Sequence, residues 1–155
     1  MSKTTQRLPT VKQNLLSFAL GAVFIWFAFQ KLGSPVDFLK AIREYEILPP
    51  SPVFLANGVA IWIPWLELFA GVAIWIPRFR KASAWVMACF LMVFTAAVLF
   101  RALEEQARQG IAFCEVAFDC GCGTGVTLIC TKLAENAVLI AASWYLAIKT
   151  PAQTP

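Results

Sequence analysis

The sequence predicts an all-α, polytopic membrane protein: a bundle of four spanning helices with a short interfacial helix after the first. Of its 155 residues, 59% are hydrophobic and 14% are charged, which is far outside the range of a soluble globular domain. Four apolar runs reach the length of about 20 residues that a helix needs to cross the hydrocarbon core. Histidine is absent, which excludes His-ligated haem, zinc and iron sites and histidine-dependent catalytic triads. We expect a single membrane domain over residues 1–155.

The first span is expected at about residues 13–32. Its apolar run, Leu15 to Phe29, is not followed by a small-residue cleavage pattern, so we interpret it as a retained helix and not as a signal peptide. Residues 36–48 then place apolar side chains between charges, which is the pattern of a short amphipathic helix at the membrane interface. This second segment is too short and too charged to span the bilayer.

The second span is expected at about residues 53–77, after a proline-rich break. Pro64 removes one backbone donor and predicts a bent helix that packs inside the bundle. Glu67 lies close to the bilayer midplane, where an acidic side chain costs about 2.5–3.5 kcal/mol on insertion scales. That cost makes Glu67 a candidate functional residue. The alternative is a protonated acid that hydrogen-bonds a neighbouring helix for packing alone.

The third span is expected at about residues 82–103, followed by a polar loop at about 104–125 that we place in the periplasm. The span contains Cys89. A lone cysteine on an apolar helix is far more often a small core residue than a reactive one. We therefore leave Cys89 out of the candidate site.

The fourth span is expected at about residues 126–148. Lys132, Glu135 and Asn136 lie three and four residues apart in it, and we expect them on one face, toward the bundle interior. Lys132 and Glu67 fall at comparable depths. We therefore expect an intramembrane pairing of Lys132 with a carboxylate, either as part of a functional site or as a structural salt bridge.

The loop and the start of the fourth span carry the chemistry, in the form of four cysteines: Cys114, Cys120, Cys122 and Cys130. The Cys-Gly-Cys spacing brings two thiols close in any fold, so a disulfide, a thiol relay and a soft-metal site are all open. A disulfide between such near neighbours closes a small, strained ring, and strained exposed disulfides are typically the reducible, catalytic ones. A structural staple would gain more from a longer loop. The pattern favours a redox role and leaves three pairings of the four cysteines open.

Basic residues near the span ends predict the orientation. One side carries seven bases and no acids: Lys3, Arg7, Lys12, Arg78, Arg80, Lys81 and Lys149. The other side carries five bases (Lys31, Lys40, Arg43, Arg101 and Arg108) against seven acids (Asp37, Glu44, Glu46, Glu104, Glu105, Glu115 and Asp119). Both termini are therefore expected in the cytoplasm of a bacterium, with the cysteine loop on the oxidising, periplasmic side of the inner membrane. The net charge of +4 reports this orientation and not a nucleic-acid partner.

Several short motifs occur in order along the chain: Phe29-Gln-Lys-Leu-Gly-Ser-Pro35, Tyr45 with Leu48-Pro49, Pro64-Trp-Leu-Glu-Leu68, Cys120-Gly-Cys122-Gly123, and Lys132 to Asn136. In this order the chain resembles, from about residue 15 to 148, the DoxX/MauE group of small four-helix membrane proteins. The resemblance implies a redox-associated inner-membrane protein. It links the MauE branch to disulfide formation in a periplasmic partner and the DoxX/DoxD branch to quinone-coupled sulfur oxidation. The phenylalanine of the MauE pattern Cys-x-Cys-Phe-Gly is missing here.

We therefore expect thiol–disulfide exchange at the periplasmic face with a soluble thioredoxin-like partner. Cys120 and Cys122 would form the mixed disulfide with the partner, and a second, resolving pair would come from Cys114 or Cys130. An isoprenoid quinone bound between the helices is the expected electron acceptor. A quinone and proton network is expected from Glu67, Lys132, Glu135 and Asn136.

Two other classes of function stay open. Four thiolates without histidine suit copper(I) or zinc, so the same cysteines are also candidates for a soft-metal site. The chain would instead be a non-catalytic accessory or assembly subunit of a larger membrane complex if its cysteines form permanent structural disulfides.

Overall fold

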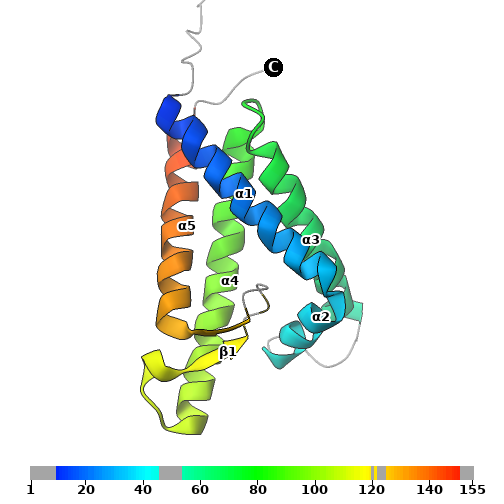
Figure 1. Ribbon diagram of the computed structural model, residues 1–155, viewed down its shortest axis with the longest axis vertical. Helices are drawn as coiled ribbons and strands as arrows, with labels where there is room; N and C mark the ends of the chain where they lie inside the picture. Colours follow the sequence, from blue (N-terminus) through cyan, green and yellow to red (C-terminus); the bar gives the residue numbers. More distant parts are fainter. Residues whose placement is uncertain (1–9, 46–53, 120, 122–124, 151–155) are drawn as a thin grey trace, which may run out of the picture.

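The computed structural model describes residues 10–45, 54–119, 121 and 125–150, and within these residues the chain is almost entirely helical (Figure 1). The helices are α1 (Val11–Gly33), α2 (Pro35–Glu44), α3 (Phe54–Ala73), α4 (Arg80–Gln109) and α5 (Ile129–Lys149). Between α4 and α5 lie a 3₁₀ helix, η1 (Phe113–Glu115), and two short strands, β1 (Ala117–Asp119) and β2 (Val126–Leu128).

Three of these helices, α1, α3 and α4, are long and apolar enough to cross a membrane. The protein is therefore a multi-pass membrane protein with three candidate spans among its described helices. The fourth, α5, has a comparable length of 21 residues, but Lys132, Glu135 and Asn136 lower its apolar character. Its role as a fourth span stays a prediction.

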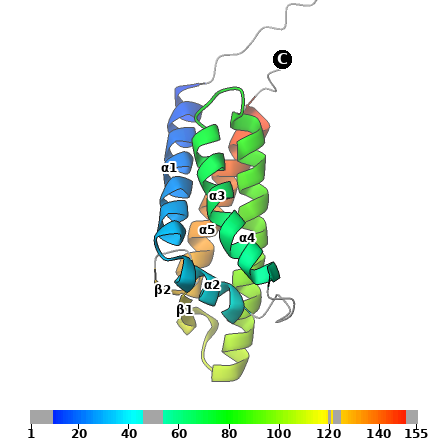
Figure 2. The same ribbon diagram turned by 90° about the vertical axis from the view of Figure 1, so that its right-hand side faces the viewer.

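The four long helices form two antiparallel pairs, α1 with α3 and α4 with α5 (Figures 1 and 2). The Gln13 amide at the start of α1 donates to the carbonyl of Lys149 at the end of α5, at 3.3 Å, so the start of α1 and the end of α5 lie at the same end of the bundle. The hairpin and α2 lie at the opposite end (Figure 1).

Two hydrophobic clusters hold the pairs together. One joins all four long helices near the chain ends and includes Leu20, Ile74, Met87 and Leu146. The other packs α4 and α5 against α2, η1 and the loop, through Tyr45, Val98, Ala102, Val116 and Ile129. Van der Waals contacts between such side chains hold membrane helices together, because lipid tails are as apolar as the side chains and leave little hydrophobic driving force.

The observed boundaries differ from the expected ones for local reasons. Helix α3 ends at Ala73 and not near residue 77. The amides of Trp75 and Ile76 donate to carbonyl oxygens three residues back, at 3.2 and 3.1 Å, and these tighter turns replace the α-helical bonds there. The interfacial helix is observed at Pro35–Glu44, and the expected residues 46–48 lie outside the described residues. The first three residues assigned to the fourth span form β2 instead.

The start of the expected loop is helical, because α4 runs on to Gln109. Glu105 accepts from Arg101 at 2.6 Å and from Gln109 at 2.9 Å, and such contacts four residues apart stabilise an exposed helix. Gly110 ends the helix with a left-handed φ of 66°, as is common just after a helix. The expectation that residue 104 begins a loop was wrong by about two turns.

The close approach of α1 and α3 depends on the absence of a side chain at Gly21. A Cβ atom at Gly21 would collide with the Trp75 indole nitrogen and would lie 2.6 Å from the Gly71 carbonyl oxygen. We expect Gly21→Ala to lower the free energy of unfolding by about 1–3 kcal/mol, the cost of overpacking. Thermal unfolding of the full chain in detergent measures this. The matched control is Gly58→Ala, where nothing lies within 4 Å, and it should be neutral or stabilising. Equal effects of the two changes would contradict the packing.

Candidate functional site

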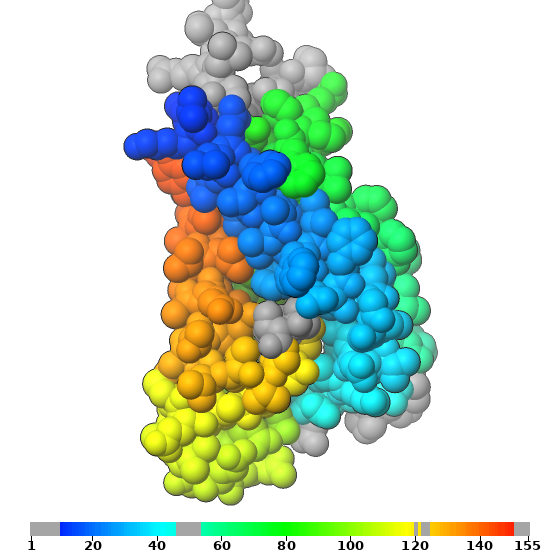
Figure 3. Space-filling view, in the orientation of Figure 1, coloured from blue at the N-terminus to red at the C-terminus, as the bar shows by residue number. Residues whose placement is uncertain are grey.

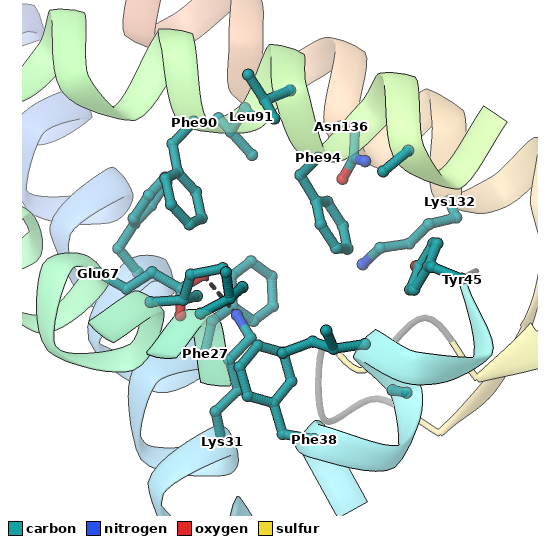
Figure 4. A pocket seen from close by; sticks show the side chains of 17 residues that line it. Phe27, Lys31, Phe38, Tyr45, Glu67, Phe90, Leu91, Phe94, Lys132 and Asn136 are labelled. Carbon is teal, nitrogen blue, oxygen red and sulfur yellow. Dashed lines mark hydrogen bonds and ion pairs between the residues drawn. The ribbon is translucent and has the colours of Figure 1, made fainter. Parts of the chain in front are cut away.

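A cavity of about 230 Å³ lies between the two helix pairs, with α2 against one side (Figure 4). All five helices contribute to its wall. The wall is mainly aromatic and aliphatic, with Phe24, Phe27, Phe38, Phe90 and Phe94 as its largest side chains. Its polar side chains are Lys31, Tyr45, Glu67, Lys132 and Asn136. Three of the four side chains expected to form a quinone and proton network thus line one cavity, and Glu135 does not.

A buried ion pair crosses from α1 to α3. The Lys31 ammonium donates to Glu67 Oε1 at 2.5 Å, and each side chain is only 5% exposed. The other carboxylate oxygen, Glu67 Oε2, is buried and has no hydrogen-bond partner among the described residues. Glu67 therefore has one oxygen held by Lys31 and one that can accept a proton.

The expected pairing of Lys132 with a carboxylate is found with Glu135 of the same helix and not with Glu67, whose partner is Lys31. Helix α1 packs directly on α3, whereas Lys132 approaches from α5 on the far side of the cavity (Figure 4). Sequence reasoning had counted Lys31 as an ordinary base at the end of a span. The available signal was a lysine in the last turn of one apolar helix and an acid in the middle of the next apolar helix.

On α5, Lys132 is only 2% exposed and points into the cavity (Figure 4). Its ammonium lies 5.3 Å from the centre of the Phe27 ring and 3.3 Å from Glu135 Oε2. The Asn136 amide donates to Thr95 Oγ1 at 3.1 Å, which ties α5 to α4 beside the cavity.

Glu135 does not face the bundle, contrary to expectation, and its side chain is 53% exposed. Each residue turns an α-helix by about 100°, so Lys132 and Asn136 share a direction while Glu135 falls to one side of it. Glu135 therefore reaches Lys132 from the outer surface and does not line the cavity.

Tyr45 is a cavity residue that sequence reasoning did not assign to the site. It is 8% exposed and meets the ring of Phe118 in β1 edge to face, with 6.3 Å between the ring centres. Burial, helped by the nearby Asp119 carboxylate, raises the pKa of the Tyr45 phenol above its ordinary value. The phenol therefore stays protonated at neutral pH.

The structure pairs two of the loop cysteines. Cys114 in η1 and Cys130 at the start of α5 form a disulfide, with 5.1 Å between their Cα atoms. This bond takes two of the four thiols away from a four-thiolate metal site in this structure. The Cys120 and Cys122 candidates lie outside the described residues. Cys89 is a free thiol on the exposed face of α4 and does not line the cavity, so its expected place in the core was wrong.

The antiparallel β1–β2 hairpin, which the sequence did not predict, carries the Cys-Gly-Cys motif between its strands. Gly121, the residue between the two cysteines, has a left-handed φ of 70°, and its amide donates to Asp119 Oδ1 at 2.9 Å. A Cβ atom at Gly121 would lie 2.9 Å from the Ala41 methyl and 3.3 Å from the Phe38 ring. Both of these α2 side chains line the cavity. Figure 3 shows the hairpin region in yellow beside α2 in cyan.

The donor set of the cavity fits a flat, apolar molecule with acceptor oxygens. Phenylalanine rings supply the apolar walls, Lys132 supplies a charged donor, and Tyr45 and Asn136 are polar groups in the same wall. Few polar groups in a mainly apolar cavity are typical of sites for small organic ligands.

Comparison with known proteins identifies the family. The sequence model of the family described as methylamine utilisation protein MauE matches residues 10–149. A curated relative, the methylamine utilization protein MauE of Methylophilus methylotrophus, is 31% identical over 114 residues. The match covers 74% of this chain and 53% of the relative, so the chain spans about half the length of that protein. No solved structure matches the chain.

Proposed function

This chain belongs to the MauE family, and from that premise we propose that it serves methylamine utilisation as a bacterial inner-membrane redox protein. It exchanges thiol and disulfide equivalents with a periplasmic thioredoxin-like partner through Cys120 and Cys122 and passes the electrons to quinone. Both termini lie in the cytoplasm, which agrees with the basic residues near them and with the hairpin at the opposite end of the bundle (Figure 1).

One observation carries the proposal: the residue between the two cysteines contacts the cavity wall. Gly121 packs on Phe38 and Ala41, and both line the cavity. Cys120 and Cys122 are the chain neighbours of Gly121, and consecutive Cα atoms are about 3.8 Å apart, so the proposal has both thiols near this contact. Electron transfer from these thiols to an acceptor bound in the cavity would depend on that short separation.

Disulfide exchange with the partner takes two steps. A thiolate of the reduced partner attacks the Cys120–Cys122 disulfide and forms a mixed disulfide, and the partner's second thiolate displaces the cysteine. The partner is released in its oxidised form, and Cys120 and Cys122 remain in the chain as a dithiol. Reoxidation of the dithiol to the disulfide releases two electrons and two protons, and a quinone bound in the cavity would take up both of each on its reduction to the quinol. Glu67 Oε2, buried and without a partner among the described residues, could hold one of these protons in transit.

We propose that the Cys114–Cys130 disulfide stabilises the base of the hairpin. It joins η1 to the start of α5, on either side of the strands that carry the motif. Its sequence separation is 16, and a loop of that length is expected to stabilise the fold by about 3 kcal/mol. Cys114 and Cys130 would in that case resist reduction while the motif cysteines exchange.

A redox titration of the full chain tests the proposal, with alkylation and mass spectrometry reporting each cysteine. We expect Cys120 and Cys122 to titrate together above about −250 mV, and Cys114 with Cys130 below about −300 mV. If the motif cysteines also stay oxidised below about −300 mV, both bridges are structural. The proposed exchange would then be wrong, and the accessory-subunit alternative would replace it.

A further inference from the structure

We propose that the cavity receives its ligand sideways from the bilayer, through an opening between α3 and α4, and that Lys132 is the donor that binds an oxygen of its head group. The ligand class is a quinone-type lipid, with a flat oxygen-bearing ring and a long apolar tail. This inference rests on the proposed function, because it names the entry route and the binding residue for the electron acceptor.

The opening is marked by a side chain that both lines the cavity and faces outward. Val93 of α4 is 73% exposed and still belongs to the cavity wall. Across from α4, the partly buried Val59 and Ile63 of α3 also line the cavity. Helices α3 and α4 meet at the turn between them and diverge toward α2 (Figure 1).

This opening lies on a surface that faces lipid. It falls within the two spanning helices α3 and α4, and Trp62 and Met92, close by in sequence, are exposed there at 66% and 40%. A polar ligand that used this route would have to leave water for hydrocarbon, which is costly. A lipid-soluble ligand is already in that phase, so this route favours an apolar molecule.

Lys132 is the better placed of the two cavity lysines to bind a ligand. Lys31 is held by Glu67 at 2.5 Å. Lys132 is paired at 3.3 Å with Glu135, whose side chain is half exposed to the outside. An ammonium has three protons to donate, and Glu135 accepts from one of them. Figure 4 shows the Lys132 nitrogen directed into the cavity.

The size of the cavity agrees with a head group and not with a whole lipid. Its volume of about 230 Å³ is below the roughly 300–1,000 Å³ of pockets that enclose a drug-sized molecule. A single ring fits, and a long tail has to leave through the opening beside Val93. A positive charge against the ring oxygens also favours acceptance of electrons, because it stabilises the negative charge that reduction places there.

The test measures binding alone, in a full-length Cys120→Ser/Cys122→Ser background that has no exchange chemistry at the motif. Decylubiquinone is titrated into the protein in nanodiscs, and quenching of tryptophan fluorescence reports binding. We expect Lys132→Met to weaken binding about tenfold or more, as for loss of a charged hydrogen bond. Lys132→Arg should retain most of the affinity, and Lys40→Met, at an exposed pair on α2, should have no effect.

The opening is tested with a matched pair of substitutions on α4. Val93→Trp fills the opening and is expected to slow or abolish decylubiquinone binding. Val86→Trp lies two turns earlier on the same side of the helix, outside the cavity wall, and should leave binding unchanged. In detergent, ubiquinone without a tail should bind more weakly than decylubiquinone, because it lacks the apolar contacts at the opening.

Three outcomes would overturn the inference: unchanged decylubiquinone binding in Lys132→Met, equal effects of the two tryptophan variants, or a tightly retained phospholipid that decylubiquinone does not displace. Thermal unfolding shows whether each variant is folded before it is compared. If decylubiquinone binding gives one of these outcomes while the unsubstituted chain exchanges thiols normally, this ligand route is disproved. The thiol-exchange part of the proposed function is then unaffected.

Discussion

Replacing Cys120 or Cys122 with serine will abolish disulfide exchange with a thioredoxin-like partner. Each substitution removes one of the two sulfur atoms that must alternate between thiol and disulfide, so no catalytic cycle can close. Each single variant keeps one thiol, which can attack the disulfide of an oxidised partner and form a mixed disulfide that no second thiol of the chain can resolve. Exchange is measured as oxidation of a reduced thioredoxin-like protein by the full chain in membranes, and non-reducing gels of each single variant mixed with the oxidised partner reveal the trapped complex.

The protein contains matched controls for this result. Cys89→Ser also removes one thiol, but from the exposed face of α4 and outside the cavity, so exchange should continue at the normal rate. The double variant Cys114→Ser/Cys130→Ser should lose about 3 kcal/mol of stability and keep exchange at a temperature where it is folded. Exchange that persists without Cys120 and Cys122, or that stops without Cys114 and Cys130 in a folded protein, would contradict these roles.

The second large effect is expected at the buried ion pair. Glu67→Gln leaves the Lys31 ammonium buried without its counter-charge, and Lys31→Met does the same to the Glu67 carboxylate. Each single variant is expected to lose about 3–5 kcal/mol of stability, the usual cost of breaking a buried pair on one side only. Thermal or denaturant unfolding of the full chain in detergent measures the loss.

Removing both charges together separates stability from function. Lys31→Met/Glu67→Leu replaces the pair with apolar side chains, and it is expected to recover most of the lost stability. It should not recover electron transfer, because Glu67 Oε2 is the proposed proton acceptor. Lys40→Met serves as the control for charge removal, since the Lys40–Asp37 pair is exposed and worth less than about 1 kcal/mol. Single variants as stable as the unsubstituted chain would contradict the pairing.

The helices could be predicted from the sequence because length and apolar character decide them. α1 and α3 begin within two residues of their expected starts. The ends of α3 and α4 were harder to predict, because local contacts decide them. The bonds around Glu105 carry α4 into the expected loop, and backbone bonds to the third residue back end α3 early. The hairpin was missed because strands of three residues give too short an alternation to recognise.

The candidate site was only partly predictable for a different reason. Glu67, Lys132 and Asn136 stand out in the sequence because polar side chains are costly inside a membrane. Which of them meet depends on how the helices pack, and an acid can pair with any cation that the bundle brings near it. Lys31 was therefore assigned to the surface, and Tyr45 was left out because nothing in its local sequence shows that α2 folds against the cavity.

The direct test of the account is whether the motif thiols reduce quinone in this protein. Fully reduced full-length protein, freed of reductant, is mixed without oxygen with one equivalent of decylubiquinone in nanodiscs. Quinone absorbance and cysteine alkylation are then followed together. The account predicts one quinone reduced for each Cys120–Cys122 disulfide formed, and a much slower reaction in Lys132→Met. If Cys120 and Cys122 stay as thiols while the quinone stays oxidised, electron transfer from the hairpin to the cavity is contradicted.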